Sequence, residues 1–130
     1  MHTRVVVGIP ASFDEKEDLE IISTEKYLKF LEQEGVGTVM TTAGTSTFNI
    51  LSNKEIHTLN ATVANFFSGE KIIGIPPLSL RHSLEFVKEA SLYLDDKSYI
   101  MALYPDRYYD DKTIIQYFTR IRKATKNPIF

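Results

Sequence analysis

The sequence contains no cysteine. This absence excludes disulfide bonds, a thiolate nucleophile and a zinc ion held by cysteine. Histidine is also sparse, and His2, His57 and His82 lie far apart, without the spacing of a metal-binding pair. We therefore expect no metal site and no cofactor.

The sequence also lacks an excess of positive charge and a long hydrophobic run. Fifteen Lys and Arg residues stand against seventeen Asp and Glu residues, for a net charge of −2, and no basic block interrupts this balance. Binding to nucleic acid or to an anionic membrane therefore has no electrostatic basis. The longest apolar runs, such as residues 4–9, are far too short to cross a bilayer. Because the N-terminus does not resemble a secretory leader, we expect a cytoplasmic protein.

What is present is an ordinary globular composition, with 43% hydrophobic residues in a chain of 130, enough for one core. Short β-branched runs alternate with longer stretches of helical period. The candidate strands begin near residues 5, 38, 71, 99 and 128. Their spacing of about 30 residues is the length of one strand–helix unit. This alternation predicts a single α/β domain over residues 1–130 with a parallel sheet.

The clearest local signal is the start of the second helix, where Ser52 and Glu55 have the spacing of a capping box. An apolar stripe follows, and we expect this helix to end at Gly69. The third helix is expected to run as far as Leu94, and Gly35 to terminate the first helix as its C′ residue.

Four units followed by a fifth strand fit either a complete open α/β domain or half of a barrel. An open domain of the phosphoacceptor type needs acidic residues at the ends of its first and third strands, where this sequence has Ile9-Pro10 and Ile75-Pro76. A nucleotide-binding domain needs a glycine-rich first turn, which residues 8–12 do not provide. The half barrel is therefore the favoured interpretation.

The second strand and its loop carry the most informative residues. Residues 39–47 read Val-Met-Thr-Thr-Ala-Gly-Thr-Ser-Thr, and residues 51–55 read Leu-Ser-Asn-Lys-Glu. This segment resembles the family of dihydrodipicolinate synthase and N-acetylneuraminate lyase, in which a strand leads into Gly-Thr-Thr-Gly-Glu and then a Leu-Ser/Thr-x-x-Glu helix start. Residues 10–15 are similar to the family's Thr-Pro-Phe-x-x-Asp stretch, and residues 104–109 to its Pro-Pro-Tyr-Tyr segment. The order of elements matches over the whole chain, whereas the family's barrel is about twice as long.

The resemblance implies a (β/α)8 TIM barrel, of which this chain would be the N-terminal half, with about four βα units. Members of the family are lyases that condense or cleave 2-oxo acids, usually pyruvate, through a Schiff base to a lysine on the sixth strand. By the same resemblance, Thr45 and Ser46 would hold the substrate carboxylate, and Tyr108 or Tyr109 would relay a proton. A homo-oligomer, either tetramer or dimer, is expected on this basis too.

Simpler interpretations of these four residues remain open. Thr45 and Ser46 also suit a tight turn, and Tyr108 and Tyr109 a surface or interface pair. The family's second Gly and its Glu have no counterparts after Gly44, where the chain continues Thr-Ser-Thr-Phe-Asn. These departures indicate an altered substrate or a lost activity.

A Schiff-base lysine must be buried near the C-terminal ends of the strands, so that desolvation or a neighbouring cation lowers its pKa. None of the ten lysines meets this requirement, because Lys71 falls at the other end of the third strand and the rest fall on helices or in loops. We expect no aldolase turnover from this chain alone. A fragment of a longer enzyme is favoured over a chain that pairs with a second chain, or with itself, to complete the barrel.

Two functions of different classes therefore compete. The first is a lyase of the Schiff-base, pyruvate-dependent aldolase superfamily, of which this chain is the N-terminal part. The second is a non-catalytic descendant that binds a 2-oxo acid or a sugar acid, or acts in assembly. A third interpretation limits the likeness to architecture, since barrels host many functions.

Overall fold

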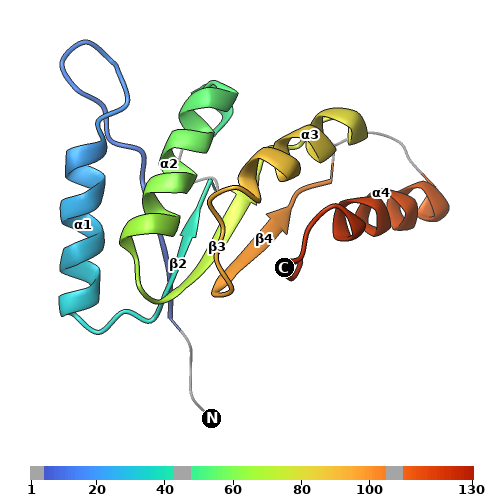
Figure 1. Cartoon of the computed structure of the whole chain (residues 1–130). Coiled ribbons are helices and arrows are strands. Elements are labelled where there is room, and N and C mark those ends of the chain that lie inside the picture. The colour runs from blue at the N-terminus through green and yellow to red at the C-terminus, as the bar shows by residue number, and fades with distance from the viewer. Residues whose placement is uncertain (1–4, 43–47, 105–109) are drawn as a thin grey trace.

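The computed structural model describes residues 5–42, 48–104 and 110–130, in which strands and helices alternate along the chain (Figure 1). The strands are β1 (Val6–Gly8), β2 (Thr38–Thr41), β3 (Glu70–Ile75) and β4 (Ser98–Ala102). The α-helices are α1 (Ile21–Gln33), α2 (Asn53–Phe66), α3 (Leu80–Ala90) and α4 (Asp111–Lys123), and a 3-10 turn, η2, spans Phe48–Ile50. The expected four βα units are confirmed.

The four strands form one parallel sheet in the order β1-β2-β3-β4. The chain end continues this order beside β4, where the amide of Ile100 donates to the Pro128 carbonyl at 2.8 Å and that of Phe130 to the Ile100 carbonyl at 2.7 Å. An open doubly wound sheet reverses its strand order at a switch point, which this sheet lacks. Strands in unbroken sequence order are the arrangement of a barrel.

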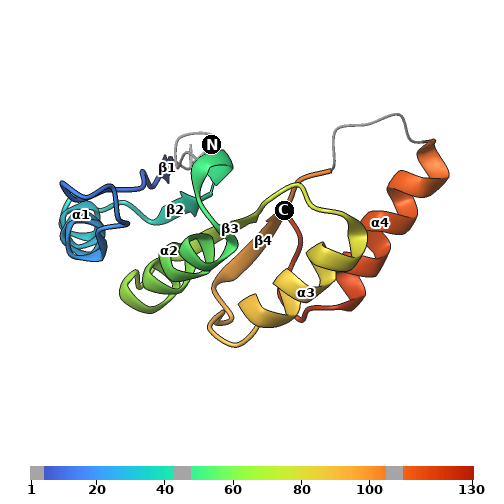
Figure 2. The same cartoon turned by 90° about the horizontal axis from the view of Figure 1, so that it is seen from above.

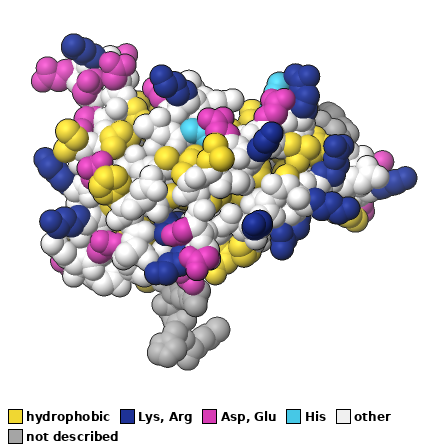
Figure 3. Space-filling model, viewed as in Figure 1, with side chains coloured by type: hydrophobic (Ala, Val, Ile, Leu, Met, Phe, Trp, Pro, Cys, Tyr) yellow, Lys and Arg dark blue, Asp and Glu magenta, His cyan; other side chains and the backbone are white. Residues whose placement is uncertain are grey.

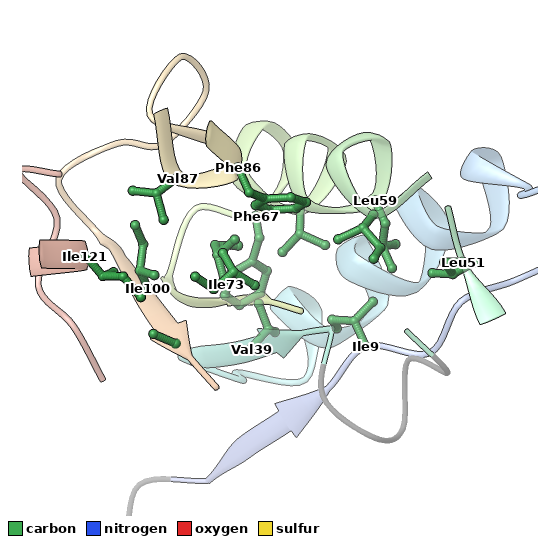
Figure 4. Close-up of a cluster of buried hydrophobic side chains, with 14 of the residues drawn as sticks. Ile9, Val39, Leu51, Leu59, Phe67, Ile73, Phe86, Val87, Ile100 and Ile121 are labelled. Atoms are coloured by element: carbon green, nitrogen blue, oxygen red, sulfur yellow. The ribbon is translucent and has the colours of Figure 1, made fainter. Parts of the chain in front are cut away.

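The helices lie on one side of the sheet, which curves away from them (Figure 2). The core fills the layer between helices and sheet, and its buried side chains include Ile9, Val39, Leu59, Phe86 and Ile121 (Figure 4). Side chains alternate between the two faces of a strand. The neighbours of the buried strand residues in this core therefore point to the opposite face of the sheet, called the inner face below. Among the inner-face residues are Val6, Met40, Ile72, Tyr99 and Met101.

The inner face is apolar but receives no helix from the described part of the chain (Figure 2). Val6 is 41% exposed, and Met40, Tyr99 and Met101 are half-buried. In a closed barrel the side chains of this face meet those of the strands across the axis. The described residues therefore build the outer layers of a barrel and one side of its interior.

Two predicted helix boundaries are confirmed. Ser52 caps α2 in a full capping box, with its amide 2.7 Å from a Glu55 carboxylate oxygen and its hydroxyl accepting from the Glu55 amide at 3.3 Å. Gly35 follows α1 with a φ of 77°, a left-handed conformation that glycine adopts without strain.

Two other boundaries differ from expectation. The second helix, α2, ends at Phe66 rather than Gly69, because Phe67 turns to an extended conformation and buries its ring in the core. The third, α3, ends at Ala90 rather than Leu94, since the amides of Leu92 and Tyr93 bond to carbonyls three residues back and tighten the chain into turns. Within the described ranges, no helix combines the length and apolar character needed to cross a membrane.

Candidate substrate-binding face

Because the strands are parallel, their C-terminal ends meet at one edge of the sheet. The chain enters residues 43–47 from the end of β2 and residues 105–109 from the end of β4, with β3 between them. All four predicted site residues, Thr45, Ser46, Tyr108 and Tyr109, lie outside the described residues. The strands that precede both segments thus end at the same C-terminal edge of the sheet, which is where barrels carry their active sites.

A buried hydrogen-bond network holds the end of β2. Asn60 of α2 is fully buried, and its side-chain oxygen accepts from the Thr41 hydroxyl at 2.5 Å. Its amide nitrogen donates to the Gly74 carbonyl at 3.1 Å. The Thr42 hydroxyl donates to the same carbonyl at 2.6 Å. The hydroxyls of Thr41 and Thr42 are therefore engaged in hydrogen bonds within the fold.

Backbone geometry at this point is unusual. Thr42 has a φ of 49°, a left-handed conformation that is a genuine outlier for a β-branched residue. Gly74 lies so close that an added Cβ would be 2.5 Å from the Thr42 hydroxyl and 2.7 Å from the Thr41 carbonyl. Such strain persists only where surrounding contacts over-determine it, and it concentrates at functional sites.

Aromatic side chains hold the end of β4 next to α4. Tyr104 meets the ring of Tyr117 edge-on at 5.4 Å between centroids and lies 6.1 Å from the ring of Phe118. The Tyr117 hydroxyl is 2.8 Å from that of Ser83 on α3, and burial raises the pKa of Tyr117. Tyr117 is thus a neutral, buried anchor that fixes the strand end from which residues 105–109 leave.

No lysine occupies this edge in the described part of the chain. Lys71 is buried, but near the N-terminal end of β3, where its Nζ donates to Asp95 at 2.7 Å and to the Phe67 carbonyl at 3.1 Å. The other lysines are all exposed, on helices or in loops. Figure 3 shows one face of the molecule, on which exposed Lys and Arg side chains are drawn in dark blue. Within the described ranges, no three histidine or carboxylate side chains converge in a way that would hold a metal ion.

Sequence reasoning missed the central member of the network at the end of β2. Asn60 stands four residues after Ile56 and three before Val63, on the apolar stripe of α2. A polar side chain on a buried stripe must find hydrogen-bond partners, and this is the signal that was available. Its partners could not be named, because they come from strands 14 to 19 residues away in sequence.

Solved structures resemble this chain closely in shape. No family model matches the sequence, and no curated protein sequence matches it either. A prophage protein of the dihydrodipicolinic acid synthase family from E. coli K12, in complex with pyruvate, superimposes with a TM-score of 0.86 at 16% identity. That match covers 95% of this chain and 42% of the other. The chain has the fold of the first half of an aldolase barrel.

Two other solved structures match this chain over a similar share of their length. Dihydrodipicolinate synthase from Oceanobacillus iheyensis gives a TM-score of 0.82 at 20% identity, covering 95% of this chain and 42% of the enzyme. N-acetylneuraminate lyase from Mycoplasma synoviae gives 0.81 at 23% identity, covering 96% and 44%. This half barrel thus spans less than half the length of the chains it matches, and it matches their N-terminal half. The fold expected from the sequence is confirmed.

Proposed function

We propose that this chain is the N-terminal half of a lyase of the Schiff-base, pyruvate-dependent aldolase superfamily. The observation that carries the proposal is the match of 95% of the chain to a structure in complex with pyruvate. The strand that precedes Thr45 and Ser46 in the sequence, β2, ends at the edge of the sheet where barrels bind their substrates. The cytoplasmic location suggested by the composition is part of the same proposal.

Thr45 and Ser46 supply the carboxylate-binding groups in this account. A hydroxyl-rich turn that leads to a helix N-terminus offers O–H and N–H donors to an anion without a fixed cation. The hydroxyls of Thr41 and Thr42 are engaged in the network with Asn60 and Gly74, which leaves the role to the residues that follow. Tyr108 or Tyr109 relays the proton, since a phenol both donates and accepts a hydrogen bond.

The rest of the machinery comes from outside these 130 residues. The proposal needs a buried lysine at the C-terminal edge of the barrel, and the lysines of the described chain lie elsewhere. Its inner face also needs the opposite half of the barrel. We propose that a later part of the protein, a second chain, or a further copy of this one completes the barrel, and that the complete protein forms a dimer or tetramer.

Titration of the purified protein with pyruvate tests this proposal. Thr45→Val removes one hydroxyl at nearly constant shape and is expected to weaken binding about tenfold or more, the worth of one hydrogen bond to a charged group. Thr58→Val, an exposed site on α2, is the matched control and should leave the affinity unchanged. If wild-type protein binds pyruvate and Thr45→Val binds it equally well, Thr45 has no role in the site.

The second candidate function is non-catalytic binding of a 2-oxo acid or a sugar acid, or a role in assembly. The observation that favours it is the loop itself, in which the second Gly and the Glu of Gly-Thr-Thr-Gly-Glu have no counterparts. Binding and turnover separate the two functions. A completed barrel that binds pyruvate but neither cleaves nor condenses any 2-oxo acid would support the binding protein.

A further inference from the structure

A row of polar side chains leads from the surface of α3 to the end of β2. Its outer member is the Glu89 carboxylate, which is 63% exposed, and the next is His57, which is 11% exposed. The His57 Nε2 is 3.2 Å from a Glu89 oxygen, and its Nδ1 is 2.9 Å from the Tyr93 hydroxyl. Asn60 forms a hydrogen bond with Tyr93, and its side-chain oxygen accepts from the Thr41 hydroxyl. The row therefore joins the outer helices to Thr41, the last residue of β2 that pairs with β3.

The partners of these groups fix the direction of each hydrogen bond in the row. Burial raises the pKa of Tyr93, and the bond from Asn60 opposes this rise. A bond that lowers the pKa of a phenol is donated to its oxygen, because it stabilises the phenolate. The Tyr93 O–H is then left to donate to Nδ1 of His57, so the neutral imidazole carries its proton on Nε2, towards Glu89. Asn60 thus donates to Tyr93, Tyr93 to His57, and His57 to Glu89.

The surroundings of His57 favour its neutral form. Its ring stacks on Phe86 at 3.8 Å between centroids, and burial lowers its pKa. The titratable groups that line the same groove are Lys54 of α2, Glu89 of α3 and Tyr93 beyond the end of α3. The Glu89 carboxylate raises the pKa of His57 again in part, so the imidazole still accepts a proton as the pH falls.

Protonation of His57 reverses one bond of the row. An imidazolium carries a proton on both nitrogens, so its Nδ1 donates to Tyr93 instead of accepting from it. The Tyr93 oxygen then receives two N–H donors, from His57 and from Asn60, and its own O–H loses its acceptor. Because a hydroxyl that is largely buried needs a partner, the phenol moves and its bond with Asn60 changes.

We propose that His57, Tyr93 and Asn60 form a proton-sensitive relay, which transmits the charge of His57 to the end of β2. This end belongs to the C-terminal edge of the sheet, so the relay links the pH of the medium around the helices to the candidate substrate-binding face. The inference does not rest on the proposed function, because it concerns only hydrogen bonds among described residues. It stands or falls whether or not the protein binds pyruvate.

Nuclear magnetic resonance of the whole chain tests the relay without any ligand. A titration from about pH 7.5 to about pH 5 follows the ring of His57, the Cζ carbon of Tyr93 and the side-chain amide of Asn60. The relay predicts that all three signals shift with one common midpoint, below the ordinary pKa of an imidazole. A Tyr93 or Asn60 signal that stays constant while His57 titrates would overturn the inference.

Tyr93→Phe separates the relay from the charge of His57, which also acts on Asn60 through space. The variant removes only the hydroxyl, so the midpoint of His57 should rise, since its neutral form loses a hydrogen-bond donor. The shift of the Asn60 amide over that titration should fall about fivefold or more. Tyr27→Phe removes a phenol hydroxyl on α1 and should leave both signals as in the wild type. An Asn60 shift of wild-type size in Tyr93→Phe shows that no relay exists.

Glu89→Gln, at the exposed end of the row, provides the test if Tyr93→Phe does not fold. It removes the carboxylate that raises the pKa of His57, so the His57 midpoint should move to lower pH. The relay requires the midpoints of Tyr93 and Asn60 to move with it by the same amount. An Asn60 midpoint that remains at its wild-type value would assign the shift to another group and overturn the inference.

Discussion

His57 is held between α2 and α3 by three contacts. Its Nδ1 is 2.9 Å from the Tyr93 hydroxyl, its Nε2 is 3.2 Å from a Glu89 carboxylate oxygen, and its ring stacks on Phe86 at 3.8 Å between centroids. Burial lowers the pKa of His57, and the Glu89 carboxylate opposes this only in part. Burial also raises the pKa of Tyr93, so its phenol stays protonated at neutral pH. His57 is thus a neutral contact between two helices.

This burial predicts a pH dependence of stability. Because the pKa of His57 is lower in the folded state than in the unfolded chain, the unfolded state binds the proton first as the pH falls. The contribution of neutral His57 to the free energy of unfolding is therefore fully present above about pH 6.5. This contribution is lost as the pH falls through the folded-state pKa of His57. The expected result is a free energy of unfolding that decreases from about pH 7.5 to about pH 5.5 in urea titrations.

The variant His57→Gln removes this titration and should give a flatter profile over the same range. The exposed His82 offers a control, and His82→Gln should keep the wild-type slope. Carboxylates whose pKa values are lowered in the folded state change the free energy of unfolding mainly below about pH 4.5, so they do not obscure this test. These carboxylates are Glu20, Glu32, Glu55, Asp95 and Asp110. A wild-type slope in His57→Gln would contradict this account.

At the scale of the element, the start of α2 is fixed by local hydrogen bonds. Ser52 and Glu55 form the capping box at the N-terminus of α2, the helix that carries Asn60. Ser52→Ala should cost about 1 kcal/mol of unfolding free energy, since it leaves an amide of the first turn without its partner. Thr58→Ala, at an exposed site of the same helix, should cost nothing measurable by urea unfolding. Equal effects of the two variants would show that the cap contributes nothing.

Local chemistry made the elements predictable. The capping box and Gly35 fix backbone conformations through neighbouring residues, so both were found from sequence. The ends of α2 and α3 were not found from the sequence. The end of α2 depends on the packing of Phe67 in the core, and the end of α3 on the turn after Ala90. Apolar periodicity located the strands, but it carries no information about the hydrogen bonds between them.

The candidate site was predictable only through the family resemblance. Thr45, Ser46, Tyr108 and Tyr109 follow from matching motifs, and they remain predictions because they lie outside the described residues. The left-handed conformation of Thr42 was not predictable, since it has no sequence signature. Its partners Asn60 and Gly74 come together only when α2 and β3 pack beside β2.

At the scale of the whole molecule, the open inner face is the feature that most needs a partner. Half-buried apolar side chains such as Met40 and Met101 lie on it, and within the described chain β1 pairs only with β2. Exposed strand edges and apolar faces favour association with further strands. We therefore expect this chain, purified alone, to associate in a concentration-dependent manner in sedimentation velocity experiments.

A charge on the inner face should prevent this association. Met101→Glu places a carboxylate on that face without touching the core on the helix side of β4. This variant is expected to sediment as a monomer, whereas Thr113→Glu, exposed on α4, should associate like wild type. Monomeric wild-type protein at every concentration would contradict the prediction, as would equal association of the two variants.

The central proposal is that these residues form the carboxylate-binding half of an aldolase barrel whose reactive lysine lies elsewhere. Incubation of the native protein with pyruvate and borohydride, followed by intact-mass and peptide analysis, tests it most directly. The account predicts a reduced pyruvate adduct on a species larger than this 14.9 kDa chain or on a partner chain, and never on a lysine of residues 1–130. An adduct on one of these lysines, or no adduct on any species of the native protein, would contradict it.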